Sequence, residues 1–376
     1  MKHILEFLNS NKNWEELLTN EPYYIKIKKD NEYILLQYTQ FLSDFSYDIV
    51  KECRGSIFKK VEDNYVCVCA PFTKFFNLGE EHAAHIDWNT ATVLEKVDGS
   101  LIKVWYDEVW HVSTNGTIDA YKAAASRGQY SFGELFEKAI AMSVNDFMAD
   151  RSKNVTYLFE LISPLAPLTV QYNTTAVYYL GAIGNNTFHE YGNSLYEPFP
   201  NCKLPKRYKL YSEEECLKAV ECMTANEEGF VIVDDDFNRV KIKSPEFLKA
   251  FHFINNNQCS IKAVLKAIME ENYDDLVAYQ HGEVKKFSQK VYKAYNSYFE
   301  DLNDIKIKAI EDSSKLDRKS FHEKYSNTVG YNYAMLIKSS VDKKYDIQSV
   351  YDYMTKLYTH RYNHFENVIK AYMQHN

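Results

Sequence analysis

The hydrophobic pattern of the chain changes from strand-like to helix-like near Pro245, and this change limits the folds that are open to it. Between residues 23 and 243, short runs rich in β-branched and aromatic residues are separated by turns, as in YYIKIKK, YVCVCA, TYLFELI and GFVIV. Helical spacing interrupts these runs over 130–148 and 213–223, and from Pro245 onward it is nearly continuous. Alternating runs with short connections are typical of antiparallel sheets.

We therefore predict an α+β fold with two domains. Residues 1–248 would form an antiparallel-sheet domain, which opens with an amphipathic helix in MKHILEFLNSNKNWEELL. Residues 249–376 would form an all-helical domain. The opening segment carries charges inside its apolar pattern, unlike a secretory signal, and no later stretch is long enough to span a membrane.

The charge balance excludes a globally basic nucleic-acid coat, because the formal net charge is −8. An enzyme that acts on nucleic acid needs only a local basic groove, and the cluster Lys285, Lys286, Lys290 and Lys293 is one source of positive charge. Seven cysteines at irregular spacing, without a CxxC pair, indicate reduced thiols in a cytosolic setting.

The stretch EKVDGS, residues 95–100, places Lys96 directly before Asp-Gly and between two predicted strands. Asp-Gly favours a tight turn, because glycine accepts a positive φ and aspartate can bond to its own backbone. Taken alone, the stretch is typical of a β-hairpin whose lysine points into solvent.

A second stretch, EEGFVIVDDDFNRVKIKS, indicates two strands joined by an acidic turn. On the returning strand Lys241 and Lys243 share one face, and Val240 and Ile242 share the other. Two lysines on one strand face usually lie in solvent. Between the two stretches, TYLFEL places Glu160 at an apolar position, where an unpaired carboxylate is costly. The ordered set of motifs is more specific than any one of them.

In this order the motifs resemble those of the covalent nucleotidyltransferases, the superfamily of ATP-dependent ligases and RNA capping enzymes, whose first motif is Lys-x-Asp-Gly. ECRGSIF at 52–58 and KFFNLGE at 74–80 are similar to stretches of the bacteriophage RNA ligase 1 family. The resemblance extends from Tyr38 to Ser244 and more weakly into the helical region. It implies an ATP-dependent RNA ligase that acts in three steps.

The resemblance implies that Lys96 attacks the α-phosphate of ATP and forms a lysyl-AMP phosphoramidate with release of pyrophosphate. AMP would then pass to an RNA 5′-phosphate, and an RNA 3′-hydroxyl would expel it. A lysine nucleophile must be neutral, although its unperturbed pKa is about 10.4. Lys241 and Lys243, with a divalent metal, would favour the neutral amine and stabilise charge on the α-phosphate.

The resemblance also implies a nucleotide-binding set. Arg54 can hold two phosphate oxygens in one plane, and its alternative is a surface arginine in a turn. Glu160 would contact the ribose hydroxyls, and Glu228 would contact the metal or the nucleotide. The spacing from Tyr38 to Arg54 differs by one residue from that of the family. The full predicted set is Tyr38, Arg54, Lys74, Asp98, Gly99, Glu160, Glu228, Lys241 and Lys243.

ATP would be the substrate and Mg²⁺ or Mn²⁺ the divalent ion, because the sequence offers carboxylates and no thiolate or histidine cage. Glu228 and Asp274 would be the metal ligands, with a solvated helix cap as the alternative for Asp274. The partner would be RNA with 5′-phosphate and 3′-hydroxyl ends, for example a cleaved tRNA anticodon loop. We further expect a monomer in the cytoplasm, that of the host if the chain is viral.

Two rival functions stay open on the sequence. A capping guanylyltransferase or a DNA ligase shares the lysine chemistry but typically continues into a β-barrel domain, whereas this chain continues into helical spacing. A catalytically inert RNA-binding module on the same fold is the rival from another class, although every motif lysine and carboxylate is present.

The helical region contains a basic stripe with helical spacing and interleaved aromatic residues. The stripe would grip an RNA backbone and stack exposed bases, or it would cover an ordinary amphipathic helix. His360 and His364, four residues apart, are interpreted as a solvated or stacked pair. The stripe consists of Lys286, Lys290 and Lys293, with Phe287, Tyr292 and Tyr295.

Overall fold

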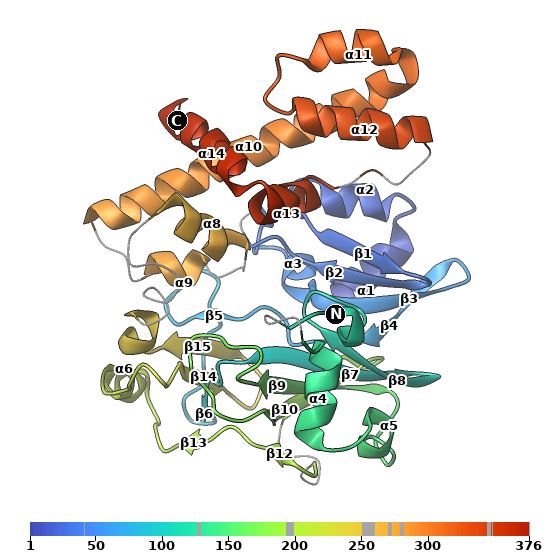
Figure 1. The fold of residues 1–376 in the computed structure, drawn as a ribbon. Coiled ribbons are helices and arrows are strands. Elements are labelled where there is room, and N and C mark those ends of the chain that lie inside the picture. The colour runs from blue at the N-terminus through green and yellow to red at the C-terminus, as the bar shows by residue number, and fades with distance from the viewer. Residues whose placement is uncertain are drawn as a thin grey trace. The chain divides into compact units, whose positions relative to one another are not determined.

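The computed structural model divides the chain into two compact units, Met1–Ile254 and Asn255–Asn376 (Figure 1). The division falls a few residues beyond the boundary after residue 248 that the sequence predicts. Each unit is described by itself. The structure describes residues 1–40, 42–125, 129–192, 199–249, 260–269, 273–278, 282–343, 347 and 349–375.

The first sheet of the N-terminal unit contains four antiparallel strands in the order β1-β2-β3-β4. Its core joins apolar residues of the strands to Ile4 and Leu8 of the first helix. The strands are β1 (Lys26–Asp30), β2 (Tyr33–Gln37), β3 (Arg54–Val61) and β4 (Asn64–Cys69), and the accompanying helices are α1 (Lys2–Ser10), α2 (Trp14–Thr19) and α3 (Asp48–Glu52).

The second sheet has the strand order β11-β10-β9-β7-β8, and β12 pairs with β10. Leu135 and Phe136 of the helix that follows β8 pack against it. The helix predicted over 130–148 is two helices, since Ala141 adopts a left-handed conformation and ends the first. The elements are β7 (Ser100–Asp107), β8 (Val109–Thr114), the 3₁₀ helix η1 (Ala120–Lys122), α4 (Phe132–Ile140), α5 (Val144–Phe147), β9 (Val155–Ile162), β10 (Ala176–Gly184), β11 (Glu190–Tyr191) and β12 (Cys202–Lys203).

The third sheet has the order β13-β6-β14-β15-β5, in which only the β15–β5 pair is parallel. A helix buries Cys216 and Val220 against Phe230 and Val240 of this sheet. The elements are β5 (Phe76–Asn77), β6 (Thr92–Glu95), β13 (Arg207–Tyr208), α6 (Glu213–Glu221), β14 (Gly229–Val233) and β15 (Arg239–Lys243).

The EKVDGS stretch connects two different sheets. β6 ends at Glu95 in the third sheet, and β7 begins at Ser100 in the second. β6 pairs with β13 and β14, whereas β7 pairs with β8 and β9. The hairpin interpretation is therefore wrong, and the chain from 96 to 99 crosses between sheets.

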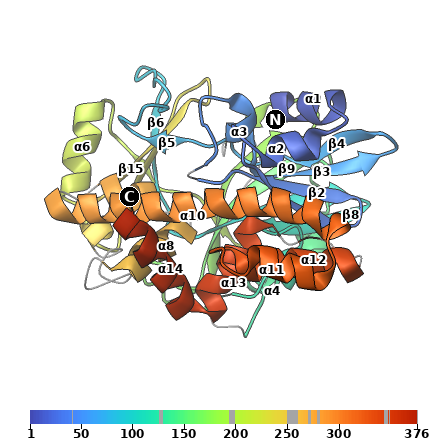
Figure 2. The ribbon, with the colours of Figure 1, turned by 90° about the horizontal axis from the view of Figure 1, so that it is seen from above.

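In the C-terminal unit the described residues form helices, and none of them lies in a strand. Figure 2 shows α10 as the long helix of the unit, and it contacts α8, α12, α13 and α14. No helix within the described residues is long and apolar enough to cross a membrane. The two units together confirm the predicted α+β class. The helices are α8 (Ile261–Met269), α9 (Tyr273–Ala278), α10 (Gly282–Lys315), α11 (Arg318–Tyr325), α12 (Tyr331–Lys343), α13 (Val350–His360) and α14 (Tyr362–His375).

Candidate active site

Backbone pairing brings Lys96 to the start of β14, where the chain crosses from the third sheet to the second. The Lys96 amide donates to the Gly229 carbonyl at 2.9 Å, directly after β6 has paired with β14. Gly229 is opposite Lys243 in the β14–β15 register, and the Ser244 amide donates to the Glu228 carbonyl at 2.8 Å. Sheet register therefore places Lys96, Glu228 and Lys243 together, although they are far apart in the sequence.

Their side chains form a chain of ion pairs centred on Glu228. Lys96 Nζ lies 2.7 Å from Glu228 Oε2, and Lys243 Nζ lies 3.0 Å from Glu228 Oε1. The Glu228 side chain is 3% exposed and that of Lys96 is 20% exposed, so the lysine is the accessible member. Burial opposes ionisation of Glu228, but the two ammonium groups outweigh it and lower the pKa of Glu228 below its usual value.

Asp98 and Gly99 fix the turn that carries Lys96. The Val170 amide donates to Asp98 Oδ2 at 2.7 Å. Burial raises the pKa of Asp98 to about 6, and the charge of Glu228 acts in the same direction. A Cβ atom on Gly99 would lie 2.7 Å from Glu160 Cγ, so only glycine allows the loop to approach β9 this closely.

Glu160 lies on β9, opposite Leu101 in the register of the second sheet. Its side chain is half-buried. Burial raises the pKa of Glu160 to about 8, and the charges of Lys96 and Arg54 only partly oppose this. At neutral pH the carboxyl group is therefore largely protonated in the free protein and can donate a hydrogen bond.

This raised pKa predicts a pH-dependent stability. The pKa of Glu160 rises from 4.5 to about 8, so folding favours the protonated carboxyl, and the free energy of unfolding falls as pH rises through this window. Glu160→Gln cannot ionise and should therefore gain stability relative to wild type between about pH 5 and about pH 8.5. Because partial exposure weakens the effect, we expect a gain on the order of 1–2 kcal/mol in urea unfolding. An equal difference at both pH values would contradict the raised pKa.

The strand β15 alternates between the core and the site. Val240 and Ile242 are buried in the core beneath α6. Lys243 is 8% exposed and contacts Glu228, and Lys241 is half-buried on the same side of the strand as Lys243. The two lysines that the sequence singles out therefore face away from the α6 core.

Arg54 begins β3 and lies close enough to Glu160 to affect its ionisation. The Arg54 guanidinium carbon is 5.2 Å from the centre of the Phe75 ring. Its Nη1 atom is buried and has no hydrogen-bond partner. A buried guanidinium donor of this kind is available for an oxygen of a ligand.

Tyr38 and Lys74 form a second cluster of the predicted residues. The Lys74 ammonium donates to Gln40 Oε1 at 2.8 Å and lies 5.2 Å from the centre of the Tyr38 ring. Phe45 and Phe76 surround it at 4.8 and 5.2 Å. Tyr38 is 5% exposed, and Gln40 was not singled out from the sequence, because no motif marks it.

The carboxylates of the site fit a divalent ion that arrives with a phosphate ligand. Within the described residues, no group of three or more histidine, cysteine, aspartate or glutamate side chains is arranged to hold a metal. Mg²⁺ is commonly held by one or two carboxylates together with substrate phosphates. Glu228 can serve as such a ligand, because its carboxylate lies at the site and the two lysines keep its pKa below the usual value, in the ionised form. Asp274 lies on α9, and its side chain falls outside the described residues.

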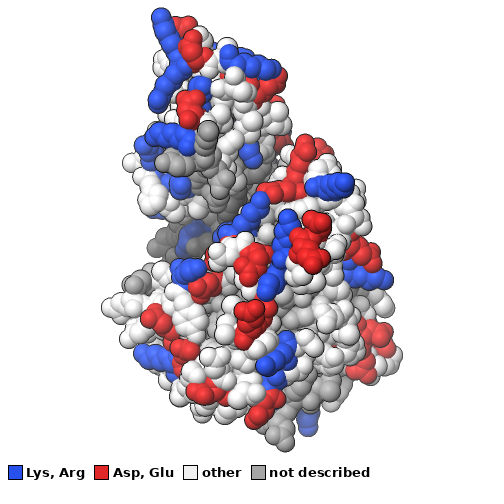
Figure 3. Space-filling model, turned by 90° about the vertical axis from the view of Figure 1, so that its right-hand side faces the viewer, with Lys and Arg blue, Asp and Glu red and all other residues white. Residues whose placement is uncertain are grey.

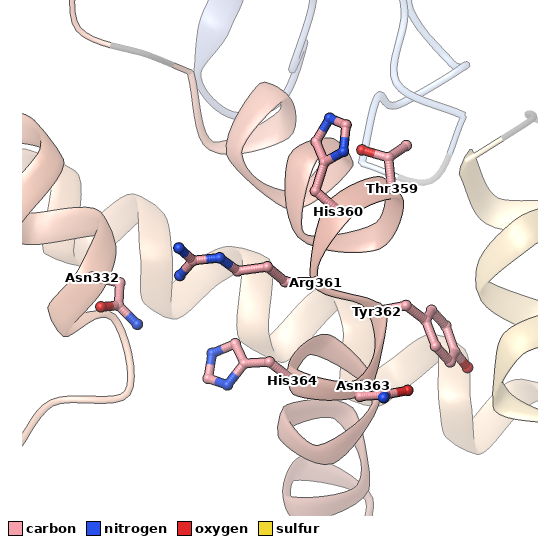
Figure 4. Close-up of a pocket in the computed structure, with 7 residues that line it drawn as sticks. All are labelled: Asn332, Thr359, His360, Arg361, Tyr362, Asn363 and His364. Atoms are coloured by element: carbon pink, nitrogen blue, oxygen red, sulfur yellow. The ribbon is translucent and has the colours of Figure 1, made fainter.

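In the C-terminal unit a groove of about 490 Å³ lies where α13 meets α14 (Figure 4). Arg361 and His364 extend toward the side on which Asn332 lies, whereas His360 extends in another direction. Both histidines are exposed and they do not stack on each other. The lining residues include no carboxylate; they are Asn332, Thr359, His360, Arg361, Tyr362, Asn363 and His364.

The basic stripe on α10 is only partly available to a ligand. Lys286, Lys290 and Lys293 are exposed. Tyr295, however, is 2% exposed in the core of the unit, and Tyr292 stacks on Tyr273 with ring centres 4.6 Å apart. Base stacking by Tyr295 is therefore excluded in this fold.

Lys96 keeps part of its side chain accessible and lies on the same carboxylate as a second cation, Lys243, and a neighbouring cation is one feature that activates a lysine nucleophile. Comparison with known proteins identifies the class of protein. A model of the RNA ligase family matches residues 52–247, more than half of the chain, and includes every residue of the Lys96–Glu228–Lys243 cluster. The chain belongs to the RNA ligase family, which confirms the family that the motifs predict.

Individual relatives carry similar names. A protein of Autographa californica nuclear polyhedrosis virus, assigned as a bifunctional polynucleotide kinase/RNA ligase, is 28% identical over 81% of this chain. The chain spans 45% of that relative's length. An RNA ligase of Rhodothermus phage RM378 is 24% identical over 74% of this chain and 77% of the phage protein.

Among solved structures, an archaeal ATP-dependent RNA ligase aligns with 92% of this chain and 83% of its own. The TM-score of this alignment is 0.43 at 12% identity.

Proposed function

We propose that this chain is an ATP-dependent RNA ligase that joins a 5′-phosphate to a 3′-hydroxyl through lysyl-AMP and adenylylated RNA. The observation that carries the proposal is the 2.7 Å pair of Lys96 and Glu228 at the crossing between two sheets, inside the segment that matches the RNA ligase family. Lys96 is the accessible amine of the pair. The cations Lys243 and Arg54 would match the negative charge of the triphosphate.

In the first step the Lys96 amine forms a bond to the α-phosphorus of ATP, and the bond from that phosphorus to the bridging oxygen breaks to release pyrophosphate. The amine must first lose its proton, and the cations Lys241 and Lys243, with a divalent ion bound beside ATP, would favour that loss. Lys243 holds Oε1 of Glu228 and so fixes the carboxylate in place. Mg²⁺, when bound with ATP, would neutralise the phosphates, with Glu228 as a protein ligand.

The remaining groups have roles that follow from their protonation. Arg54 would use its free Nη1 to hold a phosphate oxygen. Glu160, protonated at neutral pH, would donate to a ribose oxygen. An oxygen of the RNA 5′-phosphate then takes AMP from Lys96, which breaks the phosphoramidate bond and frees the amine, and attack by the 3′-hydroxyl on that activated phosphate expels AMP.

The nucleotide is tested by labelling. We expect α-labelled ATP with Mg²⁺ to leave an acid-labile label on the protein in a denaturing gel, and α-labelled GTP to leave none. Labelling by GTP at a similar rate would favour a capping enzyme. The described residues of the C-terminal unit argue for the ligase, because they form helices where a β-barrel would be needed.

We also propose that the C-terminal unit selects the RNA, with a cleaved tRNA anticodon loop as the physiological substrate. Two surfaces support an RNA contact: the exposed Lys286, Lys290 and Lys293, and the groove with Arg361 and His364. On the face drawn in Figure 3, the blue Lys and Arg atoms and the red Asp and Glu atoms intermingle. We therefore expect RNA to contact these two surfaces and not the whole surface of the unit.

Charge reversal tests this selection. Replacing Lys286, Lys290 and Lys293 by Glu should weaken binding of tRNA halves and reduce the slope of log affinity against log salt by about one unit per lost phosphate contact. Arg361→Glu alone should reduce the slope by about one unit. The matched control reverses Lys308, Arg318 and Lys319, which are exposed in the same unit and give the same change in charge. Equal slopes in the stripe and control variants would contradict a specific contact.

A further inference from the structure

One charged side chain of the N-terminal unit is buried completely and plays no part in the chemistry above. Lys103 lies on β7 with 0% exposure, on the same face of the strand as Trp105, which packs in a core with Leu35 and Ile57 of the first sheet. Burial lowers the pKa of Lys103, and the nearby Arg54 acts in the same direction. Burying a lysine in such surroundings lowers the stability of the fold unless its ammonium group donates a hydrogen bond.

The contact is with the backbone next to Arg54. Lys103 Nζ donates to the Gly55 carbonyl, the second residue of β3. Gly55 has a φ of +79°, and a Cβ atom there would lie 2.4 Å from the Asn115 carbonyl and 3.0 Å from Lys103 Nζ. Lys103, Gly55 and Asn115 therefore form one tight junction between the first and second sheets.

The junction leaves polar atoms around Arg54 without protein partners. Arg54 Nη1 and Asn115 Oδ1 are both buried and have no hydrogen-bond partner. In a relaxed loop these groups would turn to find partners or water. A rigid attachment of Gly55 explains why the Arg54 donor can stay free beside Glu160.

We infer that Lys103 is a positioning residue: its bond to the Gly55 carbonyl fixes the start of β3 so that the Arg54 guanidinium is held ready for a phosphate of the nucleotide. The role of Arg54 toward a nucleotide rests on the proposed function, whereas the contact of Lys103 with Gly55 does not. Lys103 itself has no access to a ligand, so it acts only through Arg54.

A double-mutant cycle with Arg54 separates positioning from general stability. Lys103→Met keeps most of the side-chain volume and removes the ammonium group. In single-turnover labelling with ATP and Mg²⁺, normalised to folded protein, we expect a fall on the order of 10–100-fold, because a small misplacement of a catalytic group is costly. In the Arg54→Ala background the same substitution should cost at most a few-fold.

Controls cover folding and the alternative explanation. Val104→Ala, on the opposite face of β7, should lower the urea midpoint and leave the normalised rate near that of wild type. If Lys103→Met does not fold, Gly55→Ala tests the same junction, because its Cβ atom would displace the Asn115 carbonyl and Lys103 Nζ, and its effect on the rate should be lost in the Arg54→Ala background. An equal fold-change with and without Arg54 would overturn the inference, since it would show a purely structural role.

ATP affinity, measured calorimetrically on the same four proteins, distinguishes this inference from the proposed function. A wild-type chain that binds ATP but takes no label would contradict the proposed function. Coupling of Lys103 and Arg54 in ATP affinity would then still support positioning, and additive losses would overturn it.

Discussion

Lys96→Ala should take no covalent label from α-labelled ATP. The substitution removes the amine that we propose as the nucleophile and leaves Lys243, Arg54 and Glu160 in place, so the nucleotide would still bind but would have no acceptor. The expected loss is complete, because Lys243, the other amine that contacts Glu228, is less exposed than Lys96 and acts through its charge. Denaturing gel electrophoresis of the protein after incubation with ATP and Mg²⁺ measures it.

Two controls accompany this variant. Lys60→Ala removes an exposed lysine of the same unit and should label normally. Lys96→Ala should still seal RNA that is already adenylylated at its 5′ end, because that last step does not use the amine. A label that persists in Lys96→Ala would remove Lys96 as the nucleophile.

Substitutions along β15 should separate chemistry from packing. Lys243→Ala removes one of the two cations that hold Glu228, and we expect label formation to slow on the order of 10²–10³-fold. Lys241→Ala should slow it similarly if its charge acts on the α-phosphate. Single-turnover labelling, normalised to folded protein, measures both effects.

The matched controls are the alternate residues of the same strand. Val240→Ala and Ile242→Ala should lower the free energy of unfolding by roughly 0.5–5 kcal/mol, because both side chains are buried beneath α6, while the folded fraction labels at a nearly normal rate. Near-normal labelling in both lysine variants would show that Lys241 and Lys243 take no part in the reaction. Inactive but folded Val240 and Ile242 variants would place the catalytic face on the other side of the strand.

The β15 strand shows how much of the site the sequence predicts. Strand alternation is a local rule, so the sequence separates Lys241 and Lys243 from Val240 and Ile242 without knowledge of the fold. The importance of Glu160 can also be predicted, because a carboxylate inside an apolar run is costly unless it has a partner or a ligand. These signals require only the residues next to each position.

Long-range features were not predictable in the same way. EKVDGS has the local pattern of a hairpin, and only the pairing of β6 with β14 and of β7 with β9 reveals that it crosses between sheets. The contact of Lys96 with Glu228 depends on that crossing and on the β14–β15 register. Neither register is encoded within a short stretch.

Lys103 and Tyr295 illustrate signals that were missed or misjudged. In LIKVWY, Lys103 shares the face of Leu101 and Trp105, so its burial could have been predicted from period-two spacing. Tyr295 lies among lysines in sequence, but the helical turn directs it into the core of its unit. Helical spacing shows which residues share a face of the helix. It does not show which face packs against the rest of the unit.

The most direct test of the account is to locate the label. After incubation with ATP and Mg²⁺ under conditions that preserve the phosphoramidate, protease digestion and mass spectrometry should find one adenylyl group, on the peptide that contains Lys96. Lys241 and Lys243 should carry none, because both would act on the phosphate through their charge, and Lys243 is less exposed than Lys96. An adenylyl group on any other lysine, or none on a chain that ligates RNA with ATP, would contradict the account.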